Sequence, residues 1–271
     1  MKEGRNVVIP SLWEYLYISF AILEYIFYSK YYFGHIFILF LFICCMAKPR
    51  IKLIFFDMDG VLFDVGYFED RKGLAASSWA LVAEAIGATE EENKLKELWS
   101  RGSIKNYVEW VGMSLEIYKR HGLDREKFHK VLGSVGLMPG AKETLAELRK
   151  RGYKTAIITG GFKELAERAK LELGINYIIA ACELIFDEKG KLVDWNTFPC
   201  DYHGKVKFFE ALIAGLDLKP EECAMIGDGV NDIPIAKECG LSIAFNAREE
   251  LKKHCSVSID KKDLREVLRY F

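Results

Sequence analysis

Two aspartates, Asp57 and Asp59, end a short apolar run, and their types and spacing indicate chemistry. The segment 51–64 reads IKLIFFDMDGVLFD, and its apolar part has the length and composition of a buried β-strand. Such a strand presents the residues that follow it at the carboxyl edge of an open α/β sheet, where these sheets bind ligands. Two neighbouring carboxylates repel each other unless a cation or a shared proton relieves them. The pair therefore indicates a divalent metal with oxygen ligands.

A group of small polar residues follows the predicted strand 154–158, and a lysine lies further along the chain. Thr159, Gly160 and Gly161 combine a hydroxyl with glycine N–H groups, a set that can form an anion cradle. Lys205 follows a glycine at the start of a predicted helix and adds an ammonium group. These residues are suited to binding a phosphate.

A second pair of carboxylates, Asp228 and Asp232, lies in the sequence GDGVND after another predicted strand. Because the carboxyl ends of parallel strands meet at one edge, we expect this pair to share a crevice with Asp57 and Asp59. The combined set suits a magnesium ion bound to a phosphate. Taken singly, each group is also compatible with an ordinary turn, and GDGVND with a calcium-type loop. Their order after successive strands favours one shared site.

The elements that must position these groups alternate between strands and helices, which predicts an α/β fold with a Rossmann-like, doubly wound parallel sheet. The block 66–138 lacks strand signals and is predicted to be an inserted α-helical cap, in which Thr89 and Glu92 indicate a capping box. Segments 48–65 and 139–271 are then the core domain.

The composition is typical of a globular protein and excludes some classes of partner and site. Of the 271 residues, 51% are hydrophobic, and a net charge of −1 offers no electrostatic case for a nucleic-acid partner. The seven cysteines are odd in number and include no CxxC pair, which argues against a disulfide framework or a zinc site. A reducing compartment, the cytoplasm, is expected. The sequence leaves the oligomeric state open.

The first part of the chain, residues 1–47, differs from the rest because it is crowded with aromatic and aliphatic side chains. One interpretation is an over-extended start, with Met46 as the true first residue. The alternative is a membrane anchor, for which the basic residues after residue 47 would keep the catalytic domain in the cytoplasm. A membrane is therefore an expected partner only if these residues are translated.

The motifs together resemble those of the haloacid-dehalogenase-like phosphohydrolases, and within that family the phosphoserine phosphatase branch. They are DMDGV at Asp57, TGG at Thr159, Lys205, and GDGVND at Gly227, and the resemblance extends over residues 51–271. It implies a magnesium-dependent phosphomonoesterase that hydrolyses a small phosphorylated metabolite, phosphoserine or a relative, through an aspartyl phosphate. Alternatives are the same chemistry on phosphoglycolate or a sugar phosphate, and a membrane-tethered binding module without catalysis.

The resemblance also implies a role for each motif residue. Asp57 would be the nucleophile, Asp59 the general acid and base, and Lys205 the cation that orients Asp57 and neutralises the phosphoryl charge. The residues implied to bind phosphate or substrate are Thr159, Gly160, Gly161 and Asn231. The residues implied to hold Mg²⁺ are Asp57, Asp59 through its backbone carbonyl, Asp228, and Asp232 in a supporting position.

Members of that branch carry a glutamate soon after the first motif and a cap arginine that pairs with the substrate carboxylate. Here the nearest acidic residues are Glu69 and Asp70, which fit only after a shift, and the nearest arginines are Arg101 and Arg120. The exact substrate therefore stays open. Three aromatic residues of the predicted cap are candidates either for an apolar pocket or for internal packing: Trp99, Tyr107 and Trp110.

Overall fold

The protein is described by a computed structural model that covers residues 50–66, 77–200 and 202–271. The expected N-terminal extension and the residues Glu69 and Asp70 lie outside the described residues.

The centre of the fold is a seven-stranded sheet in the order β6-β5-β4-β1-β7-β8-β9, and all neighbouring strands are parallel except the pair β5–β6. The strands are β1 (Leu53–Phe56), β4 (Lys154–Phe162), β5 (Tyr177–Phe186), β6 (Leu192–Thr197), β7 (Cys223–Gly227), β8 (Leu241–Phe245) and β9 (Val257–Ile259).

Strand β1 occupies the middle of the sheet. Its four residues, Leu53–Phe56, are fully buried, because β4 pairs with one edge, β7 pairs with the other, and helices cover the faces. A continuous apolar run is the composition that a strand buried on both faces requires. The strand ends immediately before Asp57, so this residue reaches the carboxyl edge at the centre of the sheet.

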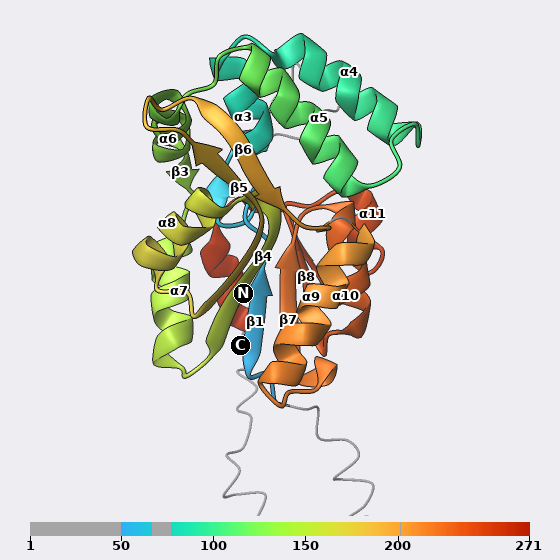
Figure 1. Cartoon of the computed structure of the whole chain (residues 1–271). Helices are drawn as coiled ribbons and strands as arrows, with labels where there is room; N and C mark the ends of the chain where they lie inside the picture. Colours follow the sequence, from blue (N-terminus) through green and yellow to red (C-terminus); the bar gives the residue numbers. More distant parts are fainter. Residues whose placement is uncertain (1–49, 67–76, 201) are drawn as a thin grey trace, which may run out of the picture. The chain divides into compact units, whose positions relative to one another are not determined.

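Helices flank the sheet, and the predicted doubly wound α/β fold is confirmed. In Figure 1, α7 and α8 lie on one side of the central strands, and α9 and α10 on the other. Phe209 of α9 packs edge-on against Phe55 of β1, with ring centroids 4.9 Å apart. The bounds are α7 (Ala141–Lys150), α8 (Lys163–Leu173), α9 (Tyr202–Gly215), α10 (Ile233–Glu238) and α11 (Glu249–Lys252), with 3-10 turns η1 (Pro220–Glu222), η2 (Val230–Asp232) and η3 (Leu264–Tyr270).

Four helices, called here the helical block, lie between two short antiparallel strands in the chain. They are α3 (Ser78–Ala85), α4 (Thr89–Ser100), α5 (Tyr107–Arg120) and α6 (Arg125–Ser134), and the strands are β2 (Phe63–Asp64) and β3 (Gly136–Leu137). Figure 1 shows the block beyond the carboxyl ends of β1 and β7. The helices therefore stand over the edge at which the predicted site residues lie.

Local expectations failed at three places. Ala88 is the N-cap of α4 and no side chain caps this end, so the predicted capping box of Thr89 and Glu92 is wrong. The physical reason is that the Glu92 side chain turns inward and is buried. The sequence pattern predicts a strand over 177–181, but β5 runs on to Phe186. It also predicts a closing helix over 261–270, but the last helix is a 3-10 helix that begins at Leu264.

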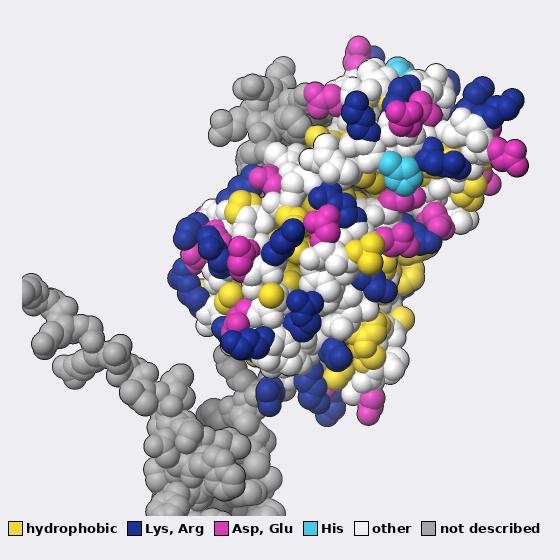
Figure 2. Space-filling model, turned by 90° about the vertical axis from the view of Figure 1, so that its left-hand side faces the viewer, with side chains coloured by type: hydrophobic (Ala, Val, Ile, Leu, Met, Phe, Trp, Pro, Cys, Tyr) yellow, Lys and Arg dark blue, Asp and Glu magenta, His cyan; other side chains and the backbone are white. Residues whose placement is uncertain are grey.

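Within the part of the chain that the structure describes, no helix has the length and apolar character needed to cross a bilayer. Figure 2 shows one face of the molecule, on which basic and acidic side chains are interspersed. This mixture on the displayed face accompanies a net charge of −1 for the whole chain.

Candidate active site

The loop after β1 is a tight turn that fixes two carboxylates. Leu62 N–H and Phe63 N–H both donate to the carbonyl of Met58, at 2.9 and 3.0 Å. Met58 is fully buried, whereas Asp57 and Asp59, one residue to either side of it, both line a cavity above the sheet edge. The turn therefore brings both aspartates to the same cavity, although the buried Met58 lies between them in the chain.

Lys205 lies beneath Asp57 and is fully buried. Its Nζ is 3.0 Å from Asp57 Oδ1 and 2.6 Å from Asp232 Oδ1. Burial by itself would lower the pKa of this ammonium group, but attraction to Asp232 and Asp57 outweighs that effect and raises the pKa. The lysine therefore stays protonated, and it holds one oxygen of Asp57 in place together with Met58 N–H, which donates to the same oxygen at 2.8 Å.

Asp232 joins Lys205 to the loop that follows β7. Its Oδ2 accepts hydrogen bonds from the backbone N–H groups of Asp228 and Gly229, both at 3.2 Å. The glycine at position 227 leaves space for this carboxylate, because a Cβ there would lie 2.2 Å from Asp232 Oδ2. Asp232 therefore braces the GDG loop, and through it the position of Asp228.

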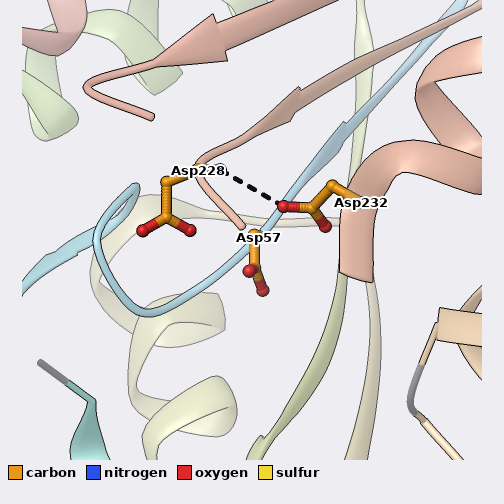
Figure 3. A group of neighbouring side chains, drawn as sticks. All are labelled: Asp57, Asp228 and Asp232. Atoms are coloured by element: carbon orange, nitrogen blue, oxygen red, sulfur yellow. Dashed lines mark hydrogen bonds between the residues drawn. The ribbon is translucent and has the colours of Figure 1, made fainter. Parts of the chain in front are cut away.

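Asp57, Asp228 and Asp232 form an acidic cluster in which one oxygen from each lies within 4.8 Å of the others (Figure 3). Burial, followed by the charges of Asp57 and Asp232, raises the pKa of Asp228 well above its usual value. Lys205 supplies only one positive charge for these three carboxylates, so a further cation would favour the ionised form of Asp228. The donor set consists of oxygen ligands only, and it fits a hard divalent cation such as Mg²⁺.

Asp59 is held by the first turn of the helical block. The N–H and the Oγ of Ser78 both donate to Asp59 Oδ2, at 2.8 and 2.7 Å, whereas Asp59 Oδ1 is buried with no hydrogen-bond partner among the described residues. Burial raises the pKa of Asp59 to about 6, against the opposing effect of the two Ser78 hydrogen bonds. A carboxyl with such a pKa can exchange a proton near neutral pH.

The TGG segment forms the end of β4 rather than a loop after it, with an irregularity in the strand register between Thr159 and Phe162. Gly161 N–H donates to Thr159 Oγ1 at 3.0 Å, so this amide is engaged within the segment. The carbonyl of Gly160 accepts from Trp79 Nε1 at 3.2 Å and from the hydroxyl of Tyr107. Both donors belong to the helical block, which is thereby tied to the phosphate-binding segment predicted from the sequence.

A cavity of about 560 Å³ lies between these residues and the helical block. Most of the predicted site residues line it, namely Asp57, Asp59, Thr159, Gly160, Gly161, Asp228 and Asn231. Lys205 and Asp232 are not in the lining, since they lie buried behind Asp57. The opposite wall is formed mainly by aromatic residues of the block, namely Trp79, Trp99, Tyr107 and Trp110.

Sequence reasoning missed several residues of the site, Trp79 among them. Ser78 is buried in the first turn of α3, and the serine pair before an apolar helix was the available signal. Arg248 follows the carboxyl end of β8, and the same strand-edge rule that identified Asp57 applies to it. Lys96 of α4 lines the cavity without any motif to mark it. Neither expected cap arginine lines the cavity, since Arg101 and Arg120 are exposed and pair with Glu97 and Glu91.

Comparison with known proteins gives consistent matches. Residues 51–240 match the family of haloacid dehalogenase-like hydrolases. A phosphoserine phosphatase of Methanocaldococcus jannaschii is 32% identical over 83% of this chain and 99% of its own length, and one of Albidiferax ferrireducens is 29% identical over 81% and 89%. A substrate-bound phosphoserine phosphatase structure superposes with a TM-score of 0.67 at 30% identity, covering 83% of this chain and all of that one.

The buried ion pairs of Lys205 lead to a prediction about the free energy of unfolding. Replacing Lys205 with Met leaves two buried carboxylates without their cation, and we expect a loss of about 3–5 kcal/mol in the free energy of unfolding near neutral pH. Burial raises the pKa of Asp232 to about 6 against the opposing charge of Lys205, so removing the lysine raises this pKa further. A carboxyl whose folded-state pKa lies above its unfolded value destabilises the fold increasingly as the pH rises. The deficit should therefore shrink between about pH 8 and about pH 5.

Denaturant titration at both pH values measures this. Lys207→Met is the matched control, because Lys207 is an exposed lysine of the same helix. An equal loss in both variants, or a deficit that does not change with pH, would contradict the assigned ion pairs.

Proposed function

Because this chain belongs to the haloacid dehalogenase-like hydrolases and is a phosphoric monoester hydrolase, we propose that it cleaves a small phosphorylated metabolite through an aspartyl phosphate on Asp57. The observation that carries the proposal is the position of this carboxylate. Asp57 lies in the cavity floor with Oδ1 bound by Lys205 and Met58 N–H. Oδ2 is then the oxygen that attacks phosphorus, and the carboxylate is held so that it cannot rotate away.

Asp59 acts as the general acid and base. Protonated, it donates its proton to the leaving alcohol oxygen, and as the carboxylate it later takes a proton from the water that hydrolyses the aspartyl phosphate. Both Ser78 donors bind Oδ2, so the partnerless Oδ1 is the atom that carries this proton. Proton transfer is therefore assigned to one oxygen and positioning to the other.

Mg²⁺ is the cofactor that the acidic cluster suits. Asp232 is already committed to Lys205 and to two backbone N–H groups, which leaves Asp57 and Asp228, with the backbone carbonyl of Asp59, as ligands and Asp232 as their support. Bound there, the ion supplies charge neutralisation for the phosphoryl oxygens.

The remaining cavity-floor residues bind the phosphoryl group. Thr159 and the Gly160 N–H are assigned to its oxygens, and Asn231 to the phosphate or the substrate. Gly161 serves indirectly, since its N–H donates to Thr159 Oγ1 and orients that side chain. Lys205 contributes its charge through Asp57, because it lies behind that carboxylate and outside the cavity lining.

The helical block is proposed to be the cap of the enzyme, within the predicted domain 66–138, over a core of 48–65 and 139–271. Trp79 and Tyr107 connect it to the carbonyl of Gly160, and Ser78 connects it to Asp59. A cap seated in this way keeps bulk water out of the cavity during phosphoryl transfer.

Phosphoserine or a relative is the proposed substrate class, supported by the names of the similar phosphatases.

A cytoplasmic location is also proposed, because a reducing compartment maintains free thiols. The cysteines that the structure describes are all free thiols, namely Cys182, Cys200, Cys223, Cys239 and Cys255.

The nucleophile assignment predicts the effect of Asp57→Asn. An amide cannot form the aspartyl phosphate, so hydrolysis of p-nitrophenyl phosphate with Mg²⁺ should fall by about a thousandfold or more. Phosphate transferred from substrate should be found on the wild-type protein and be absent from the variant. Asp194→Asn, at an exposed position of β6, is the control and should keep wild-type turnover. Retained turnover in Asp57→Asn would refute the covalent mechanism.

The hydrogen bonds from Ser78 to Asp59 lead to a prediction about the pH dependence of turnover. The hydroxyl of Ser78 stabilises the ionised form of Asp59, so Ser78→Ala should raise the pKa of Asp59 beyond about 6. The general acid must be protonated, and the alkaline limb of kcat for an alkyl phosphate should therefore move to higher pH. Asp59→Asn should lose this limb together with most of the activity. A limb that stays in place, or that moves to lower pH, would exclude Asp59 as the acid.

A further inference from the structure

The cavity extends well beyond the groups that bind phosphate, and its upper wall is aromatic. Trp110 packs edge-on against Trp79 with ring centroids 5.1 Å apart, and its centroid is 5.7 Å from that of Tyr107. Trp79 in turn packs against Phe162 of β4 at 4.4 Å. These contacts hold three lining rings in a rigid wall, which presents apolar surface directly above the catalytic carboxylates.

One polar atom of this wall lacks a partner. Trp110 is 9% exposed, and its Nε1 is buried without a hydrogen-bond acceptor in the described part of the chain. A buried indole N–H usually finds a partner, because an unsatisfied donor costs free energy. Since Trp110 lines the cavity, an acceptor on a bound ligand would satisfy this donor.

Trp99 offers a surface of a different kind. It is half-buried, lines the cavity, and stacks on no other ring among the residues that the structure describes. An aromatic side chain in that position can cover the flat face of a ligand. Neighbouring Lys96, one turn earlier on α4, lines the same part of the block.

Two cations complete the lining. Lys96 makes no ion pair or hydrogen bond within the described ranges, and burial lowers its pKa while the charge of Glu92 opposes that effect. Arg248 reaches the cavity from the core, and its side chain is likewise unpaired within those ranges. An aromatic wall can bind an organic ammonium group, but two cations that make no ion pair with any described residue disfavour such a group and favour an anion.

We propose that the cavity selects a phosphate ester whose alcohol carries a flat, unsaturated ring and a negatively charged group. The ring lies against Trp99 and the Trp79–Trp110 wall, an acceptor on the ligand takes the Trp110 N–H, and the negative group faces Lys96 and Arg248. This inference rests on the proposed phosphomonoesterase activity, but it replaces phosphoserine with a ring-bearing anionic ester as the preferred substrate. A phosphorylated three-carbon amino acid would leave the ring-binding part of the cavity empty.

The test compares esters of primary alcohols, whose leaving groups have similar intrinsic reactivity. With Mg²⁺ and the full chain, kcat/KM should rise from ethyl phosphate to benzyl phosphate to 4-carboxybenzyl phosphate, by about tenfold at each step. O-phosphoserine and phosphocholine should fall below 4-carboxybenzyl phosphate. The proposal is overturned if either of them exceeds it, or if ethyl and benzyl phosphate are hydrolysed equally well.

Two variants test which residues contact the ring and the negative group of the ligand. Trp99→Ala should reduce the ratio of kcat/KM for benzyl over ethyl phosphate, and Lys96→Met should bring the ratio for 4-carboxybenzyl over benzyl phosphate close to one. Lys94→Met is the matched control, because Lys94 lies on the same helix, is exposed and pairs with Glu90. Unchanged ratios in both Trp99→Ala and Lys96→Met would refute the assigned ring and anion positions.

Ligand-binding measurements test the proposed ligand class independently of the proposed phosphatase activity. Titration calorimetry of the same esters with Asp57→Asn measures preference without turnover. If the wild type hydrolyses none of the esters but the variant still prefers 4-carboxybenzyl over ethyl phosphate, the phosphatase assignment fails and the ligand class stands. If hydrolysis occurs and the variant shows no such preference, the ligand class fails and the phosphatase assignment stands.

Discussion

The site at the carboxyl edge of the sheet depends on the ion pairs of the buried Lys205 ammonium group. The ammonium nitrogen lies 3.0 Å from Asp57 Oδ1 and 2.6 Å from Asp232 Oδ1, with no exposure to solvent. A buried carboxylate or ammonium without its partner costs several kcal/mol, so each of the three groups is tolerated only because the others are present. Asp232 extends the constraint to the backbone N–H groups of Asp228 and Gly229. One cation thus orders Asp57, the proposed nucleophile, and the loop that carries Asp228, a proposed metal ligand.

The opposite side of the cavity depends on the helical block. Ser78 donates hydrogen bonds to Asp59, the proposed proton donor. Tyr107 and Trp79 donate to the carbonyl of Gly160 in the proposed phosphate-binding segment, so a single group of helices contacts both. The same helices supply the aromatic wall. In the proposed function, the sheet and the helical block therefore both contribute to catalysis and to substrate selection, and these few hydrogen bonds join them. A shift of the helical block would alter both at once.

Most of the residues that the sequence predicts for the site lie around one cavity, and the reason is physical. In a parallel sheet, residues that follow different strands meet at one edge, so Asp57, Thr159 and Asp228 could be grouped from their positions after apolar runs. Local rules were less reliable. The pattern at Thr89 and Glu92 resembled a capping box, yet burial of Glu92 within the helical block overrode that local preference.

By itself, the sequence determined the alternating α/β architecture and the motif residues, because both follow from local patterns of apolar, acidic and glycine residues. Only the tertiary structure decided which residues act together. Lys205 is one of 38 basic residues, and its pairing with Asp232, 27 positions away, arises from the packing of α9 against η2. The contact of Ser78 with Asp59, and the aromatic wall with Lys96, depend in the same way on where the helices are seated. Contacts between distant segments are set by packing, which no local pattern of residues records.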